Sequence, residues 1–122
     1  MVPKNLFIKR FLHLFSGIGA CKKVVIGTYL PEKDDFQLHT KNAMLEMISL
    51  SGNVTFNVDK QTRNFHAHAM FSYLEDNEIH YFGGDLKEAI VMYTGEIVIE
   101  PVAGMITKKY DPQVKIDVWN LD

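Results

Sequence analysis

The stretch from Asn64 to Leu86 constrains the fold more than any other part of this 122-residue chain. It consists of an apolar-rich segment, a polar loop at Glu75–Glu78, and a second short segment that runs into Gly83-Gly84. Two such segments joined by a short polar loop predict a β-hairpin. We therefore expect the surrounding chain to be organised as a sheet.

The predicted hairpin carries the best candidate site. Side chains two residues apart on a strand point to the same face, so His66 and His68 share one face, with Ala67 and Ala69 on the other. Asp85 lies past the two glycines on the partner segment and falls near both histidines if the hairpin pairs about its loop. Two imidazoles and a carboxylate can bind a metal ion or act as a general base, whereas the plainer interpretation is hydrogen-bonded histidines on a partly buried strand. His80 lies nearer the loop, where pairing of Phe71 or Ser72 with Ile79 or His80 would put it several residues from His66, so it is left out of the predicted ligand set.

Composition sets the class of protein. Hydrophobic residues make up 47% and charged residues 23%, which is typical of a globular domain, and the length predicts a single domain over residues 1–122. The net charge of −2 gives no large positive field for nucleic acid. The single cysteine, Cys21, excludes an internal disulfide and, together with the lack of a membrane-length apolar run, predicts a cytoplasmic protein.

Several segments allow two interpretations. Residues 4–15 fit a helical stripe or a strand, and a short apolar run interrupted by charges argues against a signal peptide. Ser16–Ala20 contains two glycines, which indicate a tight turn or a close approach of two backbones, and matches neither common phosphate-loop pattern. Lys41–Ser51 is a helix by propensity, yet its residues also alternate as in a strand.

The rest of the chain is dominated by strand candidates. At least seven of them, against one doubtful helix, predict an α+β domain with a mostly antiparallel sheet. Glu96 and Glu100 share a face of the longest candidate, where paired carboxylates suit acid–base chemistry but an exposed strand face is the simpler explanation. Cys21 is expected to be a packed residue, because no histidine lies near it in the sequence to activate a thiolate.

Five short motifs together resemble the plants-and-prokaryotes-conserved (PPC) domain, a family also catalogued as domain of unknown function 296. The resemblance runs from about Phe15 to the C-terminus. The motifs are Ser16-Gly-Ile-Gly-Ala20, Leu50-Ser-Gly-Asn53, His66-Ala-His68, Gly83-Gly84-Asp85-Leu86 and Tyr110-Asp-Pro112.

The resemblance implies a mostly antiparallel sheet of about seven strands with one flanking helix, assembled as a homotrimer. It also implies that Met1–Phe15 is an atypical or truncated version of the family's lead-in. Some family members look like metal binders through the two histidines of a His-x-His strand and a third histidine after Gly-Gly. His66 and His68 match that pattern and Asp85 takes the third position, so the implied cofactor is Zn²⁺ or another divalent cation.

Two functional hypotheses follow. The first is a homotrimeric binding module linked to DNA or to transcription regulation, as family members are usually described, with DNA or DNA-binding proteins as partners. Direct DNA binding is weakly supported, because the basic pairs Lys22-Lys23 and Lys108-Lys109 are isolated. The second is a metal-dependent enzyme or small-molecule-binding protein that uses His66, His68 and Asp85, with Glu96 as a candidate catalytic base. The sequence leaves open whether the protein is an enzyme.

Overall fold

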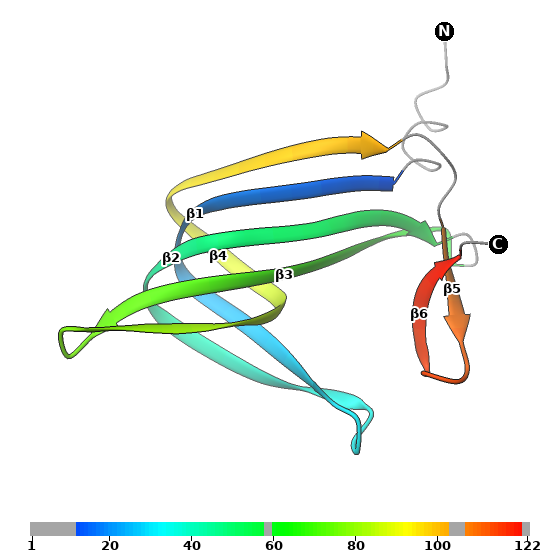
Figure 1. The fold of residues 1–122 in the computed structure, drawn as a ribbon, viewed down its shortest axis with the longest axis horizontal. Coiled ribbons are helices and arrows are strands. Elements are labelled where there is room, and N and C mark those ends of the chain that lie inside the picture. The colour runs from blue at the N-terminus through cyan, green and yellow to red at the C-terminus, as the bar shows by residue number, and fades with distance from the viewer. Residues whose placement is uncertain (1–11, 58–59, 103–106, 121–122) are drawn as a thin grey trace, which may run out of the picture. The chain divides into compact units, whose positions relative to one another are not determined.

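The computed structural model describes residues 12–57, 60–102 and 107–120. Over these ranges the chain forms strands joined by short turns, and they contain no helix. Figure 1 shows long strands followed by a short terminal hairpin. The strands are β1 (Leu12–Leu30), β2 (Asp35–Asn57), β3 (Thr62–Glu75), β4 (Glu78–Val102), β5 (Thr107–Asp111) and β6 (Ile116–Asn120).

The strands form one mixed sheet in the order β1-β4-β3-β2-β5-β6, with β1 also pairing with β2. Each of the four long strands therefore has a strand neighbour on both sides. The β2–β5 pair is parallel, through Phe56 and Thr107, whereas β3–β4 and β5–β6 are antiparallel. The prediction of an α+β fold with about seven strands and a flanking helix is wrong, because the described chain is all-β with six strands.

The segment Lys41–Ser51 shows why helix propensity fails here. It lies inside β2, where Leu45 and Met47 are buried while the intervening Glu46 is exposed. The alternation then skips one residue, since Ile48 and Ser49 are both exposed before the buried Leu50. Burial against the rest of the sheet outweighs the small intrinsic preference of these residues for a helix.

Glycines that the sequence offered as possible turns lie inside strands. Gly17 and Gly19 belong to β1, where added Cβ atoms would lie 2.5 Å and 2.6 Å from the carbonyl oxygens of Glu96 and Thr94. The close-approach interpretation of Ser16–Ala20 is therefore confirmed, and no turn separates this segment from the following strand. Similarly, Gly83-Gly84 is continuous with the rest of β4.

The chain divides into two compact units. One comprises Met1–Leu14, Asn53–Phe65 and Ile99–Asp122, and includes the β5–β6 hairpin. The other, which we call the hairpin unit, comprises Phe15–Gly52 and His66–Val98. The predicted single domain over residues 1–122 stays a prediction, and residues 1–11 of the expected atypical lead-in lie outside the described residues.

The hairpin unit has its own apolar core. Its buried members come from β1, β2 and β3, and side chains of β4 pack against them. Phe71, Ile26, Leu45 and Val24 are the largest apolar side chains that are almost completely buried. The buried residues of this core are Cys21, Val24, Ile26, Leu45, Met47, Leu50, Ala69 and Phe71.

No helix in the described ranges is long and apolar enough to cross a membrane.

Candidate metal centre

A tight turn fixes the register of the β3–β4 hairpin. Asp76 and Asn77 have φ angles of 54° and 63°, the left-handed conformation that a two-residue hairpin loop requires. The strands then pair from Glu75 with Glu78 to His68 with Asp85. Directly opposed residues in an antiparallel pair point to the same face, so Asp85 lies beside His68.

The two faces of β3 have different surroundings. Ala67 and Ala69 pack on the core of the hairpin unit, as the alternation predicted, and Phe71 continues the same face. His66 and His68 lie on the opposite face and are exposed. The strand thus holds both imidazoles at the surface while its other side is fixed by apolar packing.

The structure brings His66, His68 and Asp85 together. One nitrogen of each imidazole and one carboxylate oxygen all lie within 4.8 Å of one another. Nε2 of His66 is 3.7 Å from Oδ2 of Asp85, and the two imidazole rings meet edge to face with centroids 5.1 Å apart. Asp85 is the most sheltered of this metal triad, with a side chain 17% exposed.

Lys87 is a fourth ionisable group at this site. Its Nζ lies 3.6 Å from Oδ1 of Asp85 and 3.6 Å from the centre of the Phe36 ring. The ammonium therefore shares the carboxylate with His66. Sequence reasoning missed this residue, although its position two residues after Asp85 predicts the same strand face.

The donor set of the triad fits a divalent transition metal. A zinc ion bonded at about 2.0–2.2 Å requires ligand atoms no more than about 4 Å apart. The span of up to 4.8 Å therefore has to contract by about 1 Å on binding. Both histidines are exposed, so rotation of their side chains can supply this contraction.

Two other residues considered from the sequence lie elsewhere. Glu96 is eleven residues beyond Asp85 on β4 and lines a separate hollow with Gly19, Ala20 and Met47. His80 pairs with Tyr73, and their rings stack with centroids 5.4 Å apart. The sequence-based register, which paired His80 or Ile79 with Phe71 or Ser72, was wrong, but His80 still belongs to the opposite face from the triad.

Cys21 takes no part in the triad. It is a free thiol whose side chain is 1% exposed, and burial raises its pKa. A buried protonated thiol is a poor nucleophile. The interpretation of Cys21 as a packed residue is therefore confirmed.

Solved structures of other proteins share this fold. A candidate DNA-binding protein from Bacteroides thetaiotaomicron superposes with a TM-score of 0.78 at 22% identity, over 91% of this chain and 74% of its own. A plant- and prokaryote-conserved protein from Pyrococcus horikoshii gives 0.75 at 28% identity, over 91% and 73%. A metal-containing protein from Archaeoglobus fulgidus gives 0.74 at 28% identity, over 91% and 75%.

Comparison of the sequence with curated proteins found no match. Comparison with family profiles, in contrast, agrees with the structural comparison. The profile of the Plants and Prokaryotes Conserved (PCC) domain, the family abbreviated above as PPC, matches residues 9–103. This range includes the glycine pair of β1, the His-x-His strand and Asp85. Because the match covers more than half of the sequence, the chain belongs to the Plants and Prokaryotes Conserved domain family.

Proposed function

We propose that this protein is a binding module that holds a divalent transition metal through His66, His68 and Asp85. The observation that carries the proposal is the convergence of two imidazole nitrogens and one carboxylate oxygen within 4.8 Å. A structural relative described as metal-containing supports it. Two histidines and one carboxylate suit Zn²⁺ and also Fe²⁺, which differ in preferred coordination number.

The exposure of the triad determines what a bound ion can do. Three protein ligands leave at least one coordination position for water or for a ligand from solution. When bound, the ion supplies Lewis acidity at that open position. The part of this chain is to hold the two imidazoles on one strand face and to keep Asp85 against them through the cross-strand pair with His68.

Metal binding by purified protein tests the proposal. We expect stoichiometric Zn²⁺ or Fe²⁺ by calorimetric titration of metal-free protein, and at least about a tenfold loss of affinity in His68→Ala, which removes a ligand. Affinity should also be lower at about pH 5 than at about pH 8, because protons compete for imidazole nitrogen.

His39→Ala is the matched control, since it removes an exposed imidazole of the same unit outside the triad. Equal affinity in the wild type, His68→Ala and His39→Ala would show adventitious binding and reject the triad.

We propose, as a second function, that the module is linked to DNA through partner proteins. Structural relatives described as candidate DNA-binding proteins from Bacteroides thetaiotaomicron and Ralstonia eutropha support the link to DNA. The net charge of −2 argues that the chain alone binds DNA weakly. With a mixed-sequence duplex at physiological salt, we expect a dissociation constant weaker than about 1 µM. A tighter, salt-dependent complex would instead make this chain a direct DNA binder.

We propose, finally, that the protein assembles as a homotrimer. The family resemblance suggests this state, and the exposed large apolar side chains that β4 carries within the hairpin unit support assembly, since exposed apolar surface often marks a protein–protein contact. These residues are Ile90, Val91, Tyr93, Ile97 and Val98. Light scattering should give a mass about three times that of the 14.0 kDa chain. A monomer at micromolar concentration would exclude the trimer.

A further inference from the structure

A pocket of about 440 Å³ lies within the hairpin unit, on the face of β3 opposite the metal triad. Tyr73 lines it and shares the strand face of Ala69 and Phe71, whereas His66 and His68 lie on the other face. Its volume is within the range of about 300–1,000 Å³ that is common for small-molecule sites. The pocket is therefore large enough for a ligand and separate from the triad.

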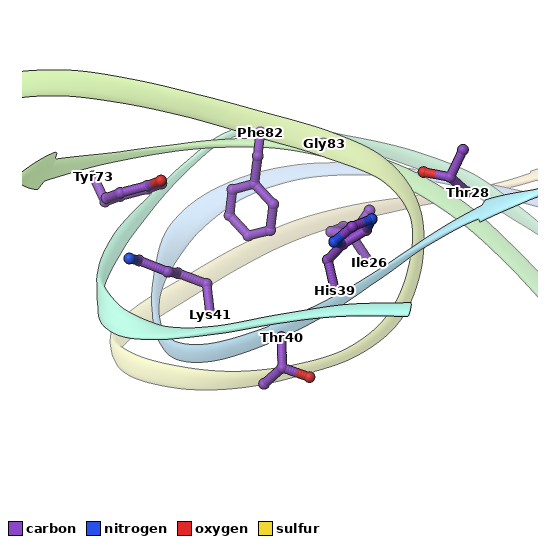
Figure 2. Close-up of a pocket in the computed structure, with 8 residues that line it drawn as sticks. All are labelled: Ile26, Thr28, His39, Thr40, Lys41, Tyr73, Phe82 and Gly83. Atoms are coloured by element: carbon purple, nitrogen blue, oxygen red, sulfur yellow. The ribbon is translucent and has the colours of Figure 1, made fainter. Parts of the chain in front are cut away.

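One wall of the pocket is apolar and fixed by the core. Ile26, which lines it, is 2% exposed. The Phe82 ring points into the space between Tyr73 and His39 in Figure 2. Behind it, Phe82 packs on the fully buried ring of Phe71, with centroids 5.8 Å apart. This wall presents an aromatic surface on which a flat apolar group can stack.

The facing wall carries groups that suit an anion. His39 and Lys41 share one face of β2, where Lys41 supplies a cation and the imidazole of His39 a hydrogen-bond donor, whereas the side chain of Thr40 points away from them (Figure 2). No carboxylate is among the described residues that line the pocket. The lining thus has positive charge without a negative counterpart of its own.

Lys41 is held in position by neighbours. Its Nζ lies 4.4 Å from the centre of the Tyr73 ring and 3.3 Å from Oε1 of Glu75, which does not line the pocket. Tyr73 is itself braced by His80 and by Phe82, whose ring centroid is 6.0 Å away. A ligand anion would therefore meet an oriented ammonium and would compete with Glu75 for it.

We propose that this pocket binds a small aromatic carboxylate. The ring packs against Phe82 and Ile26, and the carboxylate pairs with the ammonium of Lys41. A single lysine suits the single charge of a carboxylate. This site is independent of the metal triad.

The test compares 2-naphthoate with its neutral amide, 2-naphthamide, by calorimetric titration and by chemical shifts of the labelled protein. We expect 2-naphthoate to bind with perturbed amides at Lys41, Tyr73 and Phe82, and at least about fivefold more tightly than the amide. Equal affinity for the two compounds, or no binding of either at millimolar concentration, would overturn the proposal.

Two substitutions should act in opposite directions. Lys41→Met keeps an unbranched apolar side chain but removes the charge, and should weaken 2-naphthoate binding at least about tenfold without affecting the amide. Glu75→Gln removes the competing carboxylate and should tighten the binding of 2-naphthoate about threefold. If both substitutions weaken binding, or neither changes it, Lys41 is not the anion-binding group and the proposal fails.

Control variants separate this site from the others. Lys23→Met removes a lysine of the same unit that pairs with Glu88 at 3.6 Å, and should leave 2-naphthoate affinity unchanged. His68→Ala and chelators should also have no effect on it. A loss of 2-naphthoate binding in His68→Ala would place the carboxylate at the triad and reject the pocket.

Discussion

Cys21 and Asp85 show how the environment of one side chain sets its chemistry. Cys21 is enclosed by the core of the hairpin unit, and this burial raises the pKa of its thiol. Asp85 instead lies near the protein surface, beside two exposed imidazoles and the ammonium of Lys87. The thiol of Cys21 is therefore a poor nucleophile, whereas the carboxylate of Asp85 can bind a ligand.

The raised pKa of Cys21 makes stability depend on alkaline pH. The unfolded thiol ionises near its ordinary pKa of 9.0, whereas the folded thiol stays protonated to higher pH. The unfolded state therefore binds fewer protons in this window, and the free energy of unfolding falls as the pH rises above about 9. Below that pH the thiol is protonated in both states, and its ionisation does not lower the free energy of unfolding.

Chemical denaturation of the wild type and of Cys21→Ala from about pH 7 to pH 10.5 measures this effect. The alanine variant should lose less stability at the alkaline end. The comparison also removes the contribution of Tyr29, whose pKa is raised mainly by its hydrogen bond to Asp34. Parallel pH profiles would show that Cys21 ionises equally in both states.

Lys87 should oppose metal binding at the triad. Its ammonium, 3.6 Å from Oδ1 of Asp85, repels a divalent cation and occupies a carboxylate oxygen. Lys87→Met keeps an unbranched apolar side chain without the charge, and should raise Zn²⁺ affinity at least about threefold by calorimetry. Lys23→Met is the matched control and should change the affinity for Zn²⁺ little. Weaker binding in Lys87→Met would mean that the lysine positions Asp85 rather than competing for it.

At the scale of the elements, glycines allow β1 and β4 to pack closely. Gly17 is the clearest case, since its added Cβ would lie 2.5 Å from a backbone oxygen, which no side-chain rotation can relieve. Gly95 on β4 differs, because its added Cβ would only touch Val91 at 3.4 Å. The two positions therefore make a matched pair.

Gly17→Ala should destabilise the protein by about 1–3 kcal/mol, because the strands must separate to admit a methyl group. Gly95→Ala should be neutral or stabilising by up to about 1 kcal/mol, since alanine restricts the unfolded chain and φ at this residue is not left-handed. Urea denaturation of both variants measures the difference. Equal effects would mean that the approach of β1 to β4 does not depend on Gly17.

At the scale of the whole molecule, metal binding and folding should be linked. The triad joins β3 to β4, so an ion that binds only the folded chain stabilises it. At a hundredfold excess over the dissociation constant the gain is about 2.7 kcal/mol, which should raise the melting temperature by about 10 °C.

Scanning calorimetry with Zn²⁺ and with a chelator measures this shift. His68→Ala should melt at the same temperature in both conditions, whereas His39→Ala should respond like the wild type. A shift of equal size in His68→Ala would place the stabilising ion elsewhere on the protein.

The sequence by itself determined the features that depend on near neighbours. The period-two pattern placed His66 and His68 on one face of β3 and Ala67 and Ala69 on the other, and the polar loop located the turn of the hairpin. It also identified Cys21 as a packed residue. These features follow from strand geometry and turn chemistry over a few residues.

Only the tertiary structure decided where each strand begins and ends and which residues of different strands lie next to one another. Gly17 and Gly19 resembled a break in the sequence, yet they lie within β1 because β4 approaches them closely. Lys41–Ser51 became strand rather than helix because its alternate residues are buried by neighbouring strands. The pocket around Lys41 draws residues from β1 to β4. Contacts between segments far apart in the chain fix these features, and local propensity is too weak to predict them.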